Sequence, residues 1–336
     1  MRCVLVFLML LSGACLAAQE VTSADHAKAD ELLRRVASGG PPLTDAEVDI
    51  VLAASHTDEV DVDLVMLAAV VVGRHDEPIS GLQKKDFTLR EDGHLRTIAW
   101  FSEDHGREFR LMLMLDVSGS MAEGMRTAEI RAALLPLMRE IRRKDFLRLY
   151  TFAAGEVTAA SDWNNRAFST LDQALRLPRR GRTALVDALV VAADFLSRAP
   201  RERQAIVLVS DGMDNASEMT PEQVINAARS VEVPIYVFAL GGPSREIQER
   251  RGQSPLEVLH RIAEQTGGRF FLVGGEDEAE RARQAAAAIR DDLRHQYWLA
   301  FRPESPADGA FHPIDIAVKG KGLRVRSRQG YRRKKK

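Results

Sequence analysis

Short, mostly apolar segments alternate with segments of helical spacing through the middle of this 336-residue chain. The apolar segments are residues 109–115, 146–152, 205–209, 233–240 and 270–273. Strands with apolar side chains on both faces are buried inside a sheet, as they are in parallel sheets covered by helices. Strands and helices in turn therefore predict an α/β fold with a doubly wound, mostly parallel sheet.

The loop after the first of these segments carries oxygen-bearing side chains at alternate positions, Asp116, Ser118 and Ser120. In an extended turn alternate side chains point the same way, and open α/β sheets bind ligands at the carboxyl ends of their strands. We therefore expect the three side chains to converge, which suits a hard cation such as Mg²⁺. The spacing alone is weak evidence, because it should occur by chance on the order of a tenth of a time in a chain of this length.

Two further residues complete a pattern that is known from one family. Thr183 opens a predicted helix, and Asp211 stands at the end of another buried strand. Together with Asp116, Ser118 and Ser120, they resemble the metal-ion-dependent adhesion site (MIDAS) of the von Willebrand factor type A (VWA) domain. That family has D-x-S-x-S after its first strand, a Thr before a later helix and an Asp after its fourth strand. The resemblance implies a Rossmann-like VWA fold over residues 106–295.

The resemblance also implies a metal site and a way of binding. Asp116, Ser118 and Ser120 are expected to contact the metal directly, and Thr183 and Asp211 directly or through water. Mg²⁺ is the expected cation, with Mn²⁺ or Ca²⁺ as alternatives, and it keeps exchangeable coordination positions. An Asp or Glu side chain of a partner protein is then the natural remaining ligand, because it supplies an oxygen atom and a negative charge. We therefore expect an adhesion protein and not an enzyme.

Two other functions stay open, a metal-independent structural or scaffold protein and a metal-dependent hydrolase. The sequence contains no G-x-S-x-G nucleophile motif, no H-E-x-x-H zinc motif and no Walker loop. Enzymes that transfer phosphoryl groups through an aspartate usually carry a second Asp two residues on, where this chain has Ser118. The formal net charge of -1 creates no global field that would favour nucleic acid or an anionic membrane.

Further strand patterns flank the α/β region on both sides. They cover residues 62–72, 87–90 and 97–101 before it, and residues 296–301, 312–318 and 323–326 after it. Each group is too small to bury a core alone, so we expect them to pair into one discontinuous β-rich domain, residues 60–105 plus 296–331. The runs 81–93, with an Asp-Gly turn, and 322–331 are also similar to those of a group of secreted bacterial VWA-related proteins.

The N-terminus has the pattern of a secretory signal peptide over residues 1–18, with Arg2, an apolar run to Leu11 and then small residues. The apolar run is too short to span a bilayer comfortably, so no membrane span is expected after cleavage. We expect a secreted or periplasmic protein, with a lipoprotein anchored at Cys15 as the weaker alternative. Both cysteines, Cys3 and Cys15, lie in this segment, so no disulfide is expected in the mature chain. Residues 19–59 are expected to form a helical or linker segment, and residues 332–336 a basic tail.

Overall fold

The structure is a computed structural model that describes residues 64–105, 108–122, 126–153, 156–179, 203–211, 233–240, 255–273 and 277–333, and the single residues 28, 31 and 185. The predicted signal peptide, nearly all of segment 19–59, Thr183 and the last three residues of the basic tail lie outside the described residues. Residues 62–336 group into one compact unit, and residues 1–61 group separately. Among the described residues, no helix has both the length and the apolar character needed to cross a membrane.

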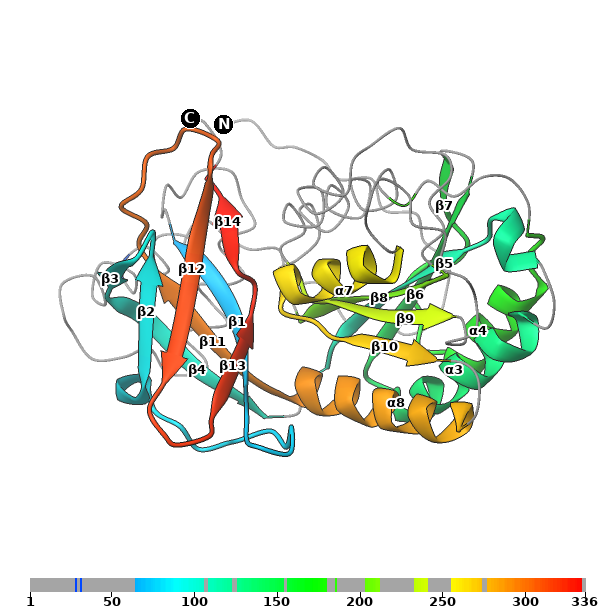
Figure 1. Cartoon of the computed structure of the whole chain (residues 1–336), viewed down its shortest axis with the longest axis horizontal. Helices are drawn as coiled ribbons and strands as arrows, with labels where there is room; N and C mark the ends of the chain where they lie inside the picture. The colour runs from blue at the N-terminus through cyan, green and yellow to red at the C-terminus, as the bar shows by residue number, and fades with distance from the viewer. Residues whose placement is uncertain are drawn as a thin grey trace. The chain divides into compact units, whose positions relative to one another are not determined.

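The central sheet of the described region has six strands in the order β10-β9-β8-β5-β6-β7 (Figure 1). They are β5 (Arg110–Asp116), β6 (Phe146–Ala153), β7 (Glu156–Ala159), β8 (Gln204–Ser210), β9 (Ile235–Leu240) and β10 (Phe270–Val273). β5 pairs in parallel with β6 on one side and with β8 on the other, and β9 and β10 continue the parallel arrangement. β7 pairs antiparallel with β6 at the edge and was not predicted. The predicted doubly wound, mostly parallel sheet is confirmed, with β5 among its inner strands.

Helices cover both faces of this sheet. The described ones are α3 (Arg126–Glu140), α4 (Ala167–Arg176), α7 (Pro255–Thr266) and α8 (Glu278–Arg294). Because side chains alternate along a strand, Leu111, Leu113 and Leu115 of β5 contribute to the core that contains α3, α4 and α8. Met112 and Met114 contribute to the core on the side of α7. Figure 1 shows α7 and α8 on opposite faces of the sheet. Burial on both faces explains why β5 is apolar at nearly every position.

The strands outside the α/β region form two further sheets that enclose a third apolar core. One has the order β13-β1-β11-β4, and the other has the order β14-β12-β2-β3. Their bounds are β1 (Val65–Val72), β2 (Phe87–Glu91), β3 (His94–Arg96), β4 (Ile98–His105), β11 (His295–Phe301), β12 (Phe311–Val318), β13 (Arg324–Ser327) and β14 (Gly330–Arg332). A short 3-10 helix, η1 (Lys84–Asp86), leads into β2.

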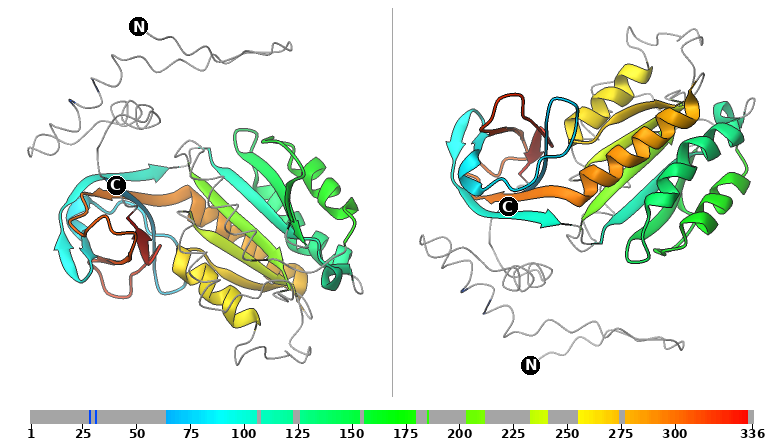
Figure 2. Two further views of the ribbon diagram at one scale, coloured as in Figure 1. Left: turned by 90° about the horizontal axis from the view of Figure 1, so that it is seen from above. Right: turned by 90° about the horizontal axis from the view of Figure 1, so that it is seen from below.

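Strands from the two ends of the region 64–333 pair with each other. β1 pairs antiparallel with β11, which places Val65 opposite Phe301, and β2 pairs antiparallel with β12. α8 ends at Arg294 and β11 begins at the next residue, so the helix continues into the strand without a linker (Figure 2). Residues 62–336 nevertheless group as one unit, so the division into a VWA domain and a β-rich domain stays a proposal.

The predicted Asp-Gly turn joins β2 to β3. Asp92 and Gly93 have φ values of 51° and 79°, the positive values that a two-residue hairpin turn requires. Glu91 and His94 are the first paired residues on either side of the turn. The Asp-Gly pair therefore sets the register of this short edge hairpin.

Candidate metal centre

The predicted metal site lies where two neighbouring inner strands end. Asp116 is the last residue of β5, and Asp211 directly follows the last residue of β8. The strands are parallel, with Leu115 opposite Val209, so both carboxylates lie at the same edge of the sheet. Asp116 is 0% exposed and Asp211 is 7% exposed. This is the edge at which open α/β sheets bind their ligands.

Hydrogen bonds hold both carboxylate oxygens of Asp116. The backbone N–H of Ser118 donates to Asp116 Oδ1 at 2.9 Å, and Ser210 Oγ donates to Asp116 Oδ2 at 2.8 Å. Ser210 was not among the predicted site residues. Its position beside Asp211 at the end of a buried strand was the one available signal. These two bonds fix the orientation of the Asp116 carboxylate.

The electrostatics of this carboxylate follow from its burial. The pKa of Asp116 is raised to about 6, mainly because burial removes hydration and to a smaller extent because of the negative charge of Asp211, while hydrogen bonds from Ser118 and Ser210 act in the opposite direction. Asp116 therefore bears a charge that its surroundings only partly stabilise.

The loop after β5 differs from the extended turn that we expected. Residues Gly119–Ala122 form a short 3-10 helix, η2, in which the Met121 N–H donates to the Ser118 carbonyl oxygen at 3.1 Å. Met121 is fully buried in the core on the α3 side, and this packing favours the tighter turn. The backbone from Gly119 to Ala122 therefore does not continue as a strand, and the alternation expected of an extended turn does not extend through this loop. The Val117 N–H donates to the Phe152 carbonyl oxygen at 3.1 Å and ties the start of the loop to β6.

The five predicted ligands have different outcomes. The structure brings Asp116, Ser118 and Asp211 to one end of the sheet, and Ser118 is fully buried there. The backbone of Ser120 lies in the same loop, whereas Thr183 lies outside the described residues. No cluster of three or more His, Cys, Asp or Glu side chains that could hold a metal occurs among the described residues. The predicted site would not form such a cluster, because it combines two carboxylates with hydroxyl groups, a donor set that fits a hard divalent cation.

Comparison with known proteins identifies a family for the central part of the chain. Residues 111–213, from β5 to just beyond Asp211, match the family model of the von Willebrand factor type A domain. An uncharacterized protein of Borreliella burgdorferi is 27% identical over 231 residues, which are 63% of this chain and 62% of that protein. Inter-alpha-trypsin inhibitor heavy chain H3 of Mesocricetus auratus is 26% identical over 145 residues, which are 39% of this chain and 16% of that protein. The chain thus spans less than two thirds of the length of these relatives.

The solved structures to which this chain is similar include two bacterial proteins. A von Willebrand factor type A protein from Catenulispora acidiphila has a TM-score of 0.45 and 12% identity, over 81% of this chain and 72% of that one. BatB from Bacteroides thetaiotaomicron has a TM-score of 0.43 and 17% identity, over 55% of this chain and 98% of that one. The match of residues 111–213 to the family model, together with the parallel sheet that ends in Asp116 and Asp211, shows that this chain contains a von Willebrand factor type A domain.

Proposed function

We propose that this protein binds a partner protein through a divalent cation at the carboxyl ends of β5 and β8, and that Mg²⁺ is the preferred cation. The cation would be held by Asp116, Ser118, Ser120, Thr183 and Asp211. An Asp or Glu side chain of the partner would complete its coordination. VWA domains commonly mediate protein–protein interaction, and the proposal adds the chemical means by which this one does so.

The observation that supports the proposal best is the burial of two carboxylates side by side. Asp116 and Asp211 end neighbouring strands at one edge of the sheet, and both are less than a tenth exposed. Buried charges of the same sign are costly unless something compensates them. A divalent cation between them would supply that compensation.

The chain's own residues prepare the site for such an ion. The Ser118 N–H and Ser210 Oγ hold the Asp116 carboxylate in one orientation, so little further ordering is needed when an ion binds. Hydroxyl ligands add oxygen atoms without adding negative charge. A bound ion would act as a Lewis acid with exchangeable positions, and a partner carboxylate would fill one of them. Binding by this route makes and breaks no covalent bond.

The proposed cellular setting follows from the N-terminal pattern. A signal peptide of residues 1–18 would direct the chain out of the cytoplasm, where free Mg²⁺ and partner proteins are available to the site. The strands of residues 60–105 and 296–331 would then flank the VWA domain as a discontinuous β-rich domain.

The first test is metal binding by the purified full-length protein. MgCl₂ or MnCl₂ is titrated into chelator-treated protein by isothermal calorimetry, for the wild type, Asp116→Ala, Asp116→Asn and Ser118→Ala. We expect saturable binding that both Asp116 variants abolish and Ser118→Ala weakens. Asp172→Asn, which changes an exposed carboxylate on α4, is the matched control and should bind as the wild type does. At a metal concentration about 100 times Kd, the ion should raise the free energy of unfolding by about 2.7 kcal/mol in the wild type and in Asp172→Asn, and should leave that of both Asp116 variants unchanged.

The second test is partner binding. The tagged protein is incubated with the native extracytoplasmic fraction, with and without EDTA, and co-purifying proteins are identified. We expect a partner that is lost with EDTA and with Asp116→Ala, while circular dichroism shows the fold unchanged. Binding that survives both treatments would favour a metal-independent scaffold. Mg²⁺-dependent turnover of phosphoester or peptide substrates would instead favour a hydrolase.

A further inference from the structure

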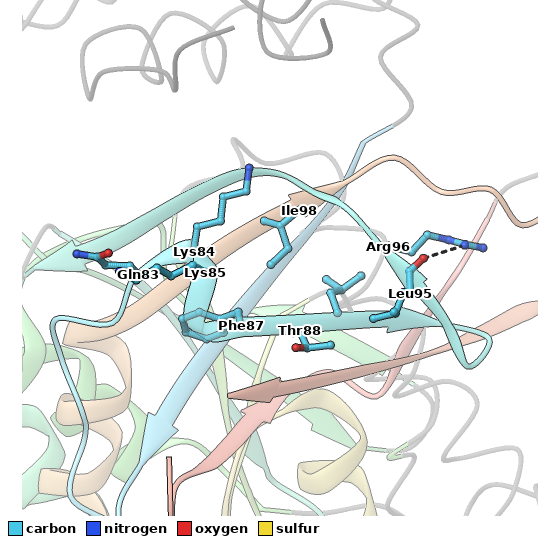
Figure 3. Close-up of a pocket in the computed structure, with 9 residues that line it drawn as sticks. Gln83, Lys84, Lys85, Phe87, Thr88, Leu95, Arg96 and Ile98 are labelled. Atoms are coloured by element: carbon cyan, nitrogen blue, oxygen red, sulfur yellow. Dashed lines mark hydrogen bonds between the residues drawn. The ribbon is translucent and has the colours of Figure 1, made fainter. Parts of the chain in front are cut away.

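An open groove of about 550 Å³ lies in the β-rich part of the described chain, and none of the predicted metal ligands lines it (Figure 3). Its lining comes from η1, β2, β3 and the first residue of β4. Phe87, Leu89 and Ile98 form an apolar floor, and each is less than a tenth exposed. Leu95 of β3 also lines the groove and is 61% exposed. Leu95 and Phe168 are the two large apolar side chains that stand out as exposed in the described part of the chain.

The groove stays open because β3 is short. β3 is the edge strand of its sheet and pairs with β2 only from Leu89 to Glu91. Phe87 and Thr88, at the start of β2, therefore lie beyond the end of β3, with β12 as their neighbour on the other side. An edge strand with backbone groups that lack a neighbouring strand is a template on which another extended chain can pair.

The charged residues of the groove are arranged asymmetrically. Figure 3 shows Lys84 and Lys85 at one end and Leu95 and Arg96 at the other. Arg96 is already neutralised, because it contacts Glu91 at 2.6 Å and Glu304 at 3.0 Å. Both lysines are exposed, and no ion pair to either occurs within the part of the chain that the structure describes. Asp86, next to them, directs its carboxylate to the Gln83 N–H at 2.8 Å. Two lysines beside one aspartate leave a net positive charge at the η1 end.

We propose that this groove binds an extended segment of a partner protein in which apolar side chains alternate with Asp or Glu. The segment would lie along the edge of β3, with its apolar side chains on the face of the sheet that carries Leu95. Its carboxylates would lie beside Lys84 and Lys85. Addition of a strand to a sheet edge uses main-chain hydrogen bonds for affinity and alternate side chains for specificity. This would be a second protein-binding site that needs no metal.

A peptide fits these observations better than a nucleic acid or a membrane does. Two lysines can neutralise few phosphates, and the groove presents no exposed aromatic side chain on which bases could stack. Stable attraction to an anionic membrane takes a larger cluster of basic residues or a second anchor. An alternating apolar and acidic peptide matches both the exposed Leu95 side chain and the positive charge at one end of the groove.

The test measures binding of a fluorescein-labelled synthetic peptide, Glu-Val-Asp-Leu-Asp-Val-Glu, to the full-length protein by fluorescence anisotropy. The same peptide with every acid replaced by lysine is the probe control. All samples contain EDTA, so that failure of the metal site cannot affect the result. We expect saturable binding of the acidic peptide and none of the basic one. No saturable binding of the acidic peptide would overturn the proposal.

Variants with matched controls locate the binding surface. Lys84→Glu/Lys85→Glu reverses the charge at the η1 end, and Lys319→Glu/Lys321→Glu makes the same charge change at exposed positions that do not line the groove. Leu95→Asp changes the exposed apolar side chain of the groove, and Phe168→Asp makes the corresponding change on α4, where Phe168 is 55% exposed. We expect each groove variant to weaken binding about tenfold or more and each control to stay within about twofold of the wild type.

Other outcomes would overturn the proposal. If the control variants weaken binding as much as the groove variants, the peptide is held by net charge and not by the groove. Binding of phosphatidylserine vesicles or of a thymidine oligonucleotide is measured with the same variants. If Lys84 and Lys85 are needed for that binding and are not needed for binding of the peptide, the groove binds a membrane or a nucleic acid and not a protein segment. Urea unfolding of each variant ensures that a loss of binding is not a loss of fold.

Discussion

Asp292 of α8 is a charged side chain buried between the α/β sheet and the β-rich part of the described chain. It is 2% exposed, accepts a hydrogen bond from Arg326 of β13, and lies 4.0 Å from Arg269. Burial raises the pKa of the Asp292 carboxyl from an ordinary value of 3.8 to about 6, and the two arginines only partly oppose this effect. The folded protein therefore favours the protonated form of Asp292 more strongly than the unfolded chain does.

The magnitude follows from the difference between the two pKa values. About two units at 1.36 kcal/mol each amount to about 3 kcal/mol. Because the folded-state pKa is the higher one, this stabilisation is fully present below about pH 4 and is lost as the pH rises through about 6. The Asp292→Asn variant has no group at this position that titrates in this pH range. The free energy of unfolding of the wild type, relative to this variant, should therefore fall by about 3 kcal/mol between about pH 4 and about pH 8.

Urea unfolding followed by circular dichroism, at several pH values in that range and with EDTA present, measures this difference. Subtracting the free energy of unfolding of the variant from that of the wild type removes the contribution of the other groups that titrate in the same pH range. Asp291→Asn is the matched control, because Asp291 is the next residue and contacts Arg290 at a partly exposed position. Its pH profile should run parallel to that of the wild type. The reasoning is wrong if the profile of Asp292→Asn also runs parallel, or if Asp291→Asn produces the same change.

Three substitutions test other features of the fold. Asp145→Ala should lower the free energy of unfolding by about 3–5 kcal/mol, because it leaves the buried Arg294 without its partner at 2.7 Å. Asp162→Ala removes an ion pair with Arg148 in which the Asp162 side chain is fully exposed, and should lower it by at most about 1 kcal/mol. Equal losses in urea unfolding would contradict this prediction. Gly93→Ala should lower the free energy of unfolding by about 1–2 kcal/mol, because φ at this position is +79°. The effect comes from the backbone alone, since an added Cβ atom would meet nothing within 4 Å. An unchanged urea midpoint would contradict the turn assignment.

The elements that could be predicted best from the sequence are strands whose residue types follow from one requirement, burial on both faces. β5 and β8 had to be apolar on both faces, so their positions and the polar residues at their ends, Asp116 and Asp211, could be predicted. The 3-10 helix from Gly119 could not, because it depends on burial of Met121 against α3, a contact that no local pattern encodes. Ser210 was missed for a similar reason. A serine at the end of a buried strand becomes part of the site only when the neighbouring strand places Asp116 within 2.8 Å of it.

The β-rich sheets and the VWA domain share more direct connections than two domains joined only by a linker would have. α8 continues directly into β11, and β11 lies between β1 and β4 in its sheet. The Asp292–Arg326 ion pair joins α8 to β13, and the Gln329 N–H donates to the Gln265 carbonyl oxygen of α7 at 3.1 Å. These links attach α8 to β13, and α7 to the residues between β13 and β14. Asp292 could not stay buried and charged without Arg326. A load applied to α8 would therefore pass directly into β11, the strand between β1 and β4, because no loop separates the helix from that strand.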